Sequence, residues 1–274
     1  MTTSIRQSEH VFVLNTPGKP AKPKGVSDMF TESTAALGIA NKHIPKDAIL
    51  NVQYPEHGQL RARKVISRSK ARATGKYPSW KMNRMVHWES PNELNAFRLL
   101  DANASVTEFV EQPAVVTYVM DGVERKHYPD IKVVMGSAKA LWEVKTRADA
   151  LDPETARRTE LMTVGLPRYG YAYHVAIADD FKKTPSLANA LILLRLGRTD
   201  IPIVERERLR RKFAEVQHLT WGLIKGGALG SMGKAYACRL ILEGALRFNM
   251  DAPLVDTTVI SATSDGGCST GSAS

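Results

Sequence analysis

The order of helix-like and strand-like segments in the middle of the chain constrains its fold most strongly. Ser90-Pro91 and Asp152-Pro153 each pair a capping residue with a proline at the first helical position, which is typical of a helix start. Runs rich in valine and tyrosine lie between them, and Asp121-Gly122 is a strong hairpin-turn signal. The expected elements are a helix from Ser90, strands at Ala114–Met120, Val123–Met135 and Lys139–Thr146, a helix at Asp152–Val164, a strand at Tyr171–Ala178 and a helix at Pro185–Leu196. This order predicts an α/β core.

The character of the sequence changes after about Asp200. A charged amphipathic helix is expected at Glu205–Trp221, a second helix at about Lys234–Leu246 and an extended piece at Leu254–Ile260. Two helices and a possible wing predict a small C-terminal domain of winged-helix character. The expected organisation is a partly flexible N-terminal extension at 1–60, a central domain at 61–198, the winged-helix-like domain at 199–262 and a flexible tail at 263–274. Residues 25–58 support no firm prediction.

The charge balance predicts a polyanionic partner. The chain carries 38 Lys and Arg against 28 Asp and Glu, a net charge of +10. This balance favours DNA or RNA ahead of an acidic membrane face, with mere solubility as the alternative. The two cysteines form no CxxC, disulfide framework or zinc cluster, which fits a reducing cytosol. No signal peptide or membrane span is evident in the sequence, so we expect a cytoplasmic protein without membrane contact.

One stretch concentrates the positive charge. Residues 61–84 contain no acidic residue, and Tyr77 and Trp80 are interleaved among the basic ones. The basic residues are Arg61, Arg63, Lys64, Arg68, Lys70, Arg72, Lys76, Lys81 and Arg84. Such a stretch predicts an arm that neutralises DNA phosphates, and a solvated loop is the alternative.

The most informative pattern is Asp130 followed by Glu143-Val144-Lys145. Side chains alternate along a strand, so Glu143 and Lys145 should share a face while Val144 points into the core. Asp130, expected on the neighbouring strand, can then face Glu143. Two carboxylates with one ammonium suit a magnesium ion and phosphodiester cleavage, in which Lys145 would orient the attacking water or neutralise the oxyanion. The Val144 carbonyl is a candidate backbone ligand of the ion.

Each of these residues also has a simpler interpretation. A D…ExK pattern is short and occurs by chance in many proteins. Glu93, the candidate helix acid, also completes a capping box with Ser90, in which it would bond back to the Ser90 amide. Glu89 is a weaker rival for the metal. His127 is expected to be a packed or surface residue rather than a base.

Taken together, several ordered blocks resemble the TnsA-type transposon endonucleases of the PD-(D/E)XK superfamily. The blocks are Arg63-Lys64, Thr74–Pro78, Arg84–Phe97, Val110–Pro113, His127–Asp130 and Leu141–Lys145. The resemblance covers about Arg61 to Asp180 and extends more faintly into the C-terminal region. It implies a restriction-endonuclease-like central mixed sheet flanked by helices, with one or two Mg²⁺ ions that Mn²⁺ could replace.

The resemblance also implies roles for single residues. By position, Glu93 matches the family's helix acid, Asp130 its central metal ligand, Glu143 its second strand acid and Lys145 its catalytic lysine. Members of the family are bacterial subunits that cut the 5′ ends of a transposon, together with a DDE-type transposase and an ATPase regulator. The alternatives are a restriction or repair endonuclease that acts alone, and a basic DNA-binding adaptor whose acids are structural.

Overall fold

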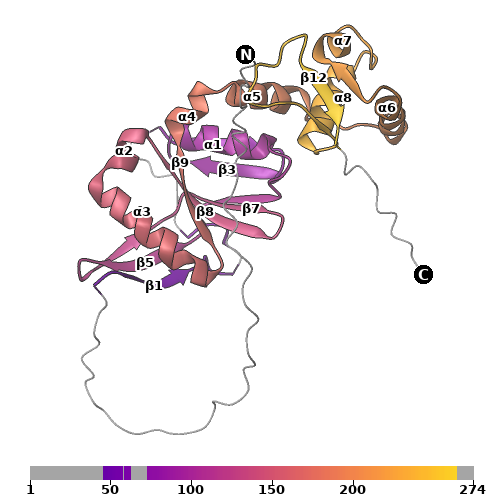
Figure 1. The fold of residues 1–274 in the computed structure, drawn as a ribbon. Coiled ribbons are helices and arrows are strands. Elements are labelled where there is room, and N and C mark those ends of the chain that lie inside the picture. Colours follow the sequence, from indigo (N-terminus) through magenta and orange to yellow (C-terminus); the bar gives the residue numbers. More distant parts are fainter. Residues whose placement is uncertain (1–45, 58, 63–72, 264–274) are drawn as a thin grey trace, which may run out of the picture. The chain divides into compact units, whose positions relative to one another are not determined.

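The computed structural model describes residues 46–57, 59–62 and 73–263, which form a mixed α/β fold (Figure 1). The α/β class expected from the sequence is therefore confirmed. The strands are β1 (Ala48–Gln53), β2 (Gly75–Ser79), β3 (Arg84–Trp88), β4 (Glu108–Glu111), β5 (Val115–Met120), β6 (Val123–His127), β7 (Ile131–Met135), β8 (Ala138–Lys145), β9 (Ala172–Ile177), β10 (His218–Thr220), β11 (Leu246–Arg247) and β12 (Val259–Ala262). The helices are α1 (Pro91–Ala102), α2 (Arg147–Leu151), α3 (Pro153–Gly165), the 3₁₀ helix η1 (Leu166–Tyr169), α4 (Ala178–Lys183), α5 (Ser186–Leu196), α6 (Ile203–Val216), α7 (Trp221–Lys225) and α8 (Gly233–Leu242).

Strands β4, β7, β8 and β9 form a four-stranded sheet in that order. The first three are antiparallel neighbours, and β9 joins β8 in parallel. Helix α1 covers one face, where Phe97 shares a core with Trp142. Helix α3 covers the other face, where Met162 shares a core with Leu141 (Figure 1). Strand β8 is therefore buried on both faces, which explains its continuous apolar run.

A second sheet has the strand order β1-β5-β6. Asp121 and Gly122 form its hairpin turn with φ of 56° and 75°, as their sequence predicted. The prediction of a single returning strand at Val123–Met135 is wrong. It is two strands, β6 and β7, which belong to different sheets and are separated by Tyr128–Asp130. Pro129 has no amide hydrogen to donate to a strand ladder, so the chain leaves one sheet there and enters the next.

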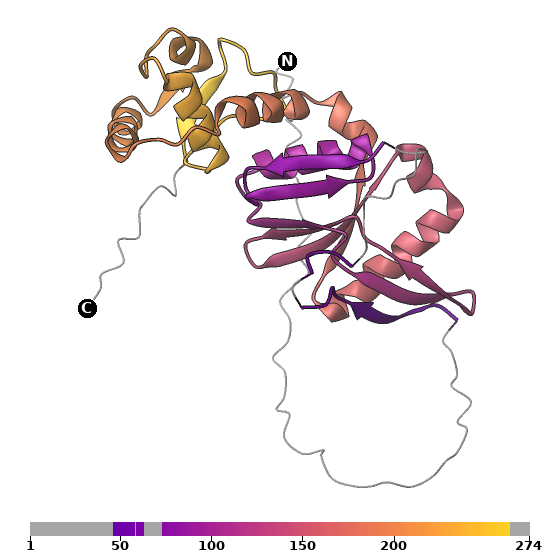
Figure 2. The ribbon, with the colours of Figure 1, turned by 180° about the vertical axis from the view of Figure 1, so that it is seen from behind.

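Strands β2 and β3 form a hairpin beside α1 (Figure 2). Asp101 of α1 is fully buried and anchors the turn of this hairpin. Its carboxylate accepts the hydroxyl protons of Tyr77 at 2.6 Å and Ser79 at 2.7 Å. It also accepts the amide protons of Trp80 at 3.0 Å and Lys81 at 2.9 Å. The second half of the basic stretch is therefore an ordered hairpin held by one buried acid.

The C-terminal elements follow the order α6, β10, α7, α8, β11 and β12, and the strands pair as β10-β12-β11. The helix expected at Glu205–Trp221 is too long. It ends at Val216 because Gln217 adopts a φ of 61°, and β10 and α7 follow. The helix expected at Lys234–Leu246 is α8, which ends at Leu242, and the extended piece expected at Leu254–Ile260 contributes only the start of β12.

One core joins α5 to the C-terminal elements. Leu193 and Leu194 of α5 lie in the same cluster as Leu209 of α6 and Ile260 of β12. The described residues all belong to one compact unit that begins at residue 43, so the domain boundary expected at 198/199 stays a prediction. The expected flexible tail lies outside the described residues except for Thr263, and part of the expected N-terminal extension forms β1. In the described parts of the chain, no helix combines the length and the apolar character that a membrane span requires.

Candidate active site

The carboxyl end of β8 presents Glu143 and Lys145 on one face of the sheet. The Lys145 Nζ atom lies 2.9 Å from Glu143 Oε1, so the two side chains meet as strand alternation predicted. Val144 points the other way, into the core that contains Phe97. Glu143 is buried, whereas Lys145 is 28% exposed and can be reached by solvent.

Asp130 lies in the break between β6 and β7, one residue before β7 begins, rather than on a strand as expected. Its amide donates to the Trp142 carbonyl at 2.9 Å, and its Oδ2 atom accepts the Val144 amide proton at 2.8 Å. These two bonds fix Asp130 beside the strand that carries Glu143. Use of the Val144 carbonyl as a metal ligand stays a prediction.

Glu93 lies buried in the first turn of α1. Ser90 is the N-cap, and its Oγ atom accepts the Glu93 amide proton at 3.1 Å. Glu93 Oε2 accepts the amide proton of Glu89 at 2.9 Å, and its Oε1 lies 3.1 Å from Ser90 Oγ. The return bond of the expected capping box therefore goes to the Glu89 amide instead of the Ser90 amide. Both carboxylate oxygens of Glu93 therefore form hydrogen bonds with residues at the start of the helix.

The three candidate acids influence one another electrostatically. Burial raises the pKa of Glu93, and the charges of Glu89 and Glu143 raise it further. Burial also raises the pKa of Asp130 well above its ordinary value, and the charges of Glu143 and Glu93 add to this rise. Carboxylates that repel one another in this way are stabilised by a bound cation.

The donor chemistry of Asp130 and Glu143 fits a hard divalent cation. Glu143 Oε2 is buried without a hydrogen-bond partner, which is costly for a carboxylate oxygen. Magnesium binds through one or two carboxylates and completes its shell with water and substrate phosphate. No three His, Cys, Asp or Glu side chains of the described residues are close enough to hold an ion. The fit therefore rests on this pair, and Glu93 as a third ligand stays a prediction.

Residues outside the Asp130 and Glu143-Val144-Lys145 pattern surround Glu143 on its other sides. His127 Nε2 lies 3.5 Å from Glu143 Oε2 and 3.0 Å from the Tyr173 hydroxyl. Arg158 of α3 comes within 4.0 Å of Glu143 Oε1. Burial lowers the pKa of His127 to about 4, although the negative charge of Glu143 alone would raise it. The imidazole is therefore neutral at pH 7. His127 was expected to be either a packed or a surface residue, and it is packed. It lies directly beside the candidate site.

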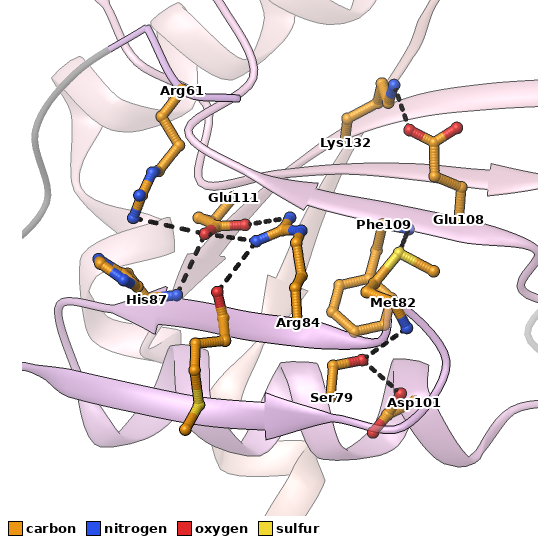
Figure 3. A network of polar contacts seen from close by, with 11 residues as sticks. Arg61, Ser79, Met82, Arg84, His87, Asp101, Glu108, Phe109, Glu111 and Lys132 are labelled. Carbon is orange, nitrogen blue, oxygen red and sulfur yellow. Dashed lines mark hydrogen bonds and ion pairs between the residues drawn. The ribbon is translucent and has the colours of Figure 1, made fainter. Parts of the chain in front are cut away.

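Two arginines of the expected phosphate arm contact a buried acid of the protein itself. Arg84 forms a bidentate ion pair with Glu111, in which its NH1 and NH2 nitrogens lie 2.9 Å and 2.6 Å from the carboxylate oxygens (Figure 3). Arg61 lies 3.6 Å from the same carboxylate, and the His87 amide donates to it at 3.2 Å. Glu111 is only 1% exposed, so these arginines compensate a charge that would otherwise be buried alone.

The other basic residues of the arm differ in their surroundings. Lys81 donates to the Asn103 carbonyl at 2.9 Å. Lys76 is exposed on β2. Five further residues lie outside the described residues: Arg63, Lys64, Arg68, Lys70 and Arg72.

No protein-family model matches this sequence, and no curated protein matches it at a significant level.

Proposed function

We propose that the chain is a divalent-metal-dependent DNA endonuclease of the PD-(D/E)XK type. The observation that carries this proposal is the arrangement at the end of β8. Glu143 and Lys145 lie 2.9 Å apart there, and Asp130 is hydrogen-bonded to the residue between them. Two acids can hold a metal ion for phosphodiester hydrolysis, and an amine beside them can stabilise the charge that develops on the phosphate.

We also propose a restriction-endonuclease-like fold for the central part of the chain and a winged-helix-like fold for the C-terminal part. The mixed sheet β4-β7-β8-β9 with helices on both faces supports the first proposal. Three helices interspersed with β10 and followed by the paired strands β11 and β12 support the second, because β11 and β12 can form the wing.

Each residue of the site has a task in this proposal. A bound Mg²⁺ or Mn²⁺ ion lowers the pKa of the attacking water and stabilises charge on the phosphate. Asp130 and Glu143 would hold the ion, with Glu93 and the Val144 carbonyl as further candidate ligands. Lys145, partly exposed beside Glu143, would orient the water or neutralise the charge that develops on the phosphate oxygens.

The particular task that we propose is cleavage of the 5′ ends of a transposon, as the TnsA-like subunit of a heteromeric transposase. The resemblance of the sequence blocks around Glu93, Asp130 and Glu143 supports this task, as does the net charge of +10. The implied partners are DNA, a DDE-type transposase subunit and an ATPase regulator.

Nicking of supercoiled DNA with Mg²⁺ or Mn²⁺, with and without the transposase partner, tests the proposal. Asp130→Asn and Lys145→Met should each lower the rate by roughly 100-fold or more. Lys132→Met is the matched control, because Lys132 on the adjacent strand is 24% exposed and pairs with Glu108 at 2.7 Å. The control should cut like the wild type. Unchanged rates in both site variants would show that the site is wrong.

A non-catalytic DNA-binding adaptor is the second candidate. It is favoured by the structural partners of the acids, because Glu93 accepts the Glu89 amide proton and Asp130 accepts the Val144 amide proton. Calorimetry that detects no Mg²⁺ or Mn²⁺ binding, with DNA affinity retained, would support the adaptor. Nicking without any transposase would instead favour an endonuclease that acts alone.

A further inference from the structure

Glu143 has a buried pair of polar neighbours on the α3 side of β8. His127 is the last residue of β6, and Tyr173 lies in β9. They are 6% and 8% exposed, and their rings meet edge to face with centroids 5.9 Å apart. One imidazole nitrogen, Nε2, faces both the Tyr173 hydroxyl at 3.0 Å and Glu143 Oε2 at 3.5 Å.

The charge of Glu143 decides which tautomer of His127 is favoured. A neutral imidazole carries its proton on only one ring nitrogen. A proton on Nδ1 would let the Nε2 lone pair accept the Tyr173 hydroxyl proton, but it would also turn that lone pair toward the Glu143 carboxylate at 3.5 Å. A proton on Nε2 instead places an N–H dipole between Glu143 Oε2 and the Tyr173 oxygen, which is electrostatically favourable in a buried site. The Nε2–H tautomer therefore fits the surroundings.

The two oxygens of Glu143 have different neighbours. Lys145 holds Oε1 at 2.9 Å. Oε2 is buried and makes no hydrogen bond, and the His127 ring nitrogen is the polar group found at 3.5 Å from it. A position that served packing alone would be filled at lower cost by an apolar ring, since a buried imidazole must be desolvated.

We propose that His127 and Tyr173 are positioning residues for Glu143. The dipole of the His127 Nε2–H orients Oε2 electrostatically from 3.5 Å without forming a hydrogen bond to it, and the Tyr173 hydroxyl, 3.0 Å from the same nitrogen, fixes the imidazole ring in place. This inference rests on the proposed function, in which Glu143 is a metal ligand. Groups that orient a ligating side chain typically change metal affinity or activity by 10–100-fold when they are removed.

Calorimetric titration of the full-length chain with Mn²⁺ alone tests the inference without any measurement of cleavage. His127→Phe keeps a ring of similar size but removes the N–H, and it should weaken Mn²⁺ binding by roughly 10-fold or more. Tyr173→Phe should weaken it less, and His127→Gln, which retains an N–H donor, should restore part of the affinity. A control, His174→Phe, should bind within about two-fold of the wild type, because the His174 ring contacts Trp142 on the opposite face of β9.

The outcomes separate this inference from the proposed function. If the wild type and the His127→Phe variant bind Mn²⁺ equally well, the positioning role is overturned and the proposed function is not. A wild type that binds no ion overturns the proposed function and the inference with it. Should His127→Phe not fold, the ring ¹⁵N signals of the wild type decide. A proton on Nδ1 overturns the inference, and a proton on Nε2 whose signal shifts in Glu143→Gln supports it.

Discussion

The amide of Val144 donates to the carboxylate of Asp130 at 2.8 Å, so the strand that carries Glu143 and Lys145 also holds Asp130 in place. One hydrogen bond does not compensate for the other influences on Asp130. Burial and the charges of Glu143 and Glu93 raise its pKa well above the ordinary value despite this bond and the nearby Lys145. Asp130 is therefore fixed in position but electrostatically disfavoured as an anion.

Asp130→Asn should stabilise the protein at neutral pH in the presence of a chelator. Because the folded-state pKa lies above the unfolded one, the wild type loses stability as pH rises through this window. Asparagine can still accept the Val144 amide proton and carries no charge, so the variant should lose this pH dependence. Urea unfolding between about pH 4 and about pH 8 measures the effect.

Asp121→Asn provides a control of opposite sign. Hydrogen bonds from Arg157 lower the pKa of Asp121, so its contribution to stability is present above the unfolded pKa and is lost as pH falls. This variant should therefore be no more stable than the wild type at neutral pH. An Asp130→Asn protein that is less stable than the wild type at about pH 8 would contradict the raised pKa of Asp130.

Arg84→Met should destabilise the fold by about 3 kcal/mol, because it leaves the buried Glu111 without its main partner. Glu111→Gln in the same chain should recover most of this loss, since the buried charge is then removed. Urea unfolding of the two single variants and the double variant closes the cycle. A single Arg84→Met variant within about 0.5 kcal/mol of the wild type would mean that Arg61 alone compensates Glu111.

Local signals made the helix starts and the hairpin turn predictable from sequence. Ser90 and Asp152 cap α1 and α3 as their sequence context indicated, because capping involves residues only two or three positions apart. The hairpin of β2 and β3 was missed because the acid that anchors it, Asp101, is 20 to 24 positions away. The break at Pro129 was visible in the sequence, but the change of sheet that it produces depends on the whole fold.

The candidate site was likewise predictable from the sequence only in part. Glu143 and Lys145 lie on the same face of β8 because side chains alternate along a strand, so their proximity could be predicted from the sequence alone. His127 and Tyr173 are 46 positions apart and meet only when β6 and β9 are assembled. The basic stretch looked free of acids because Glu111, which pairs with Arg84, is 27 positions further along the chain.

Asp101→Asn should destabilise the β2–β3 hairpin more than the rest of the fold. An amide group cannot accept all four of the hydrogen bonds that the carboxylate accepts, and a buried donor left unsatisfied costs about 1–3 kcal/mol. Hydrogen exchange should therefore accelerate at the amides of Trp80 and Lys81, while the amides of β8 stay protected. Equal acceleration in β8 would show that Asp101 supports the whole core and not the hairpin specifically.

The pairing of Arg84 with Glu111 also predicts which arm residues bind DNA. Lys76 is exposed on β2, so Lys76→Gln should weaken DNA binding and reduce the slope of log affinity against log salt by about 1. Arg84→Met should leave this slope unchanged, because Arg84 is committed to a carboxylate of its own chain. Fluorescence anisotropy with a labelled duplex over a range of salt concentrations gives both slopes. If Arg84→Met lowers the slope as much as Lys76→Gln, Arg84 exchanges Glu111 for a phosphate on binding, and the Glu111 pair is a resting state of the arm.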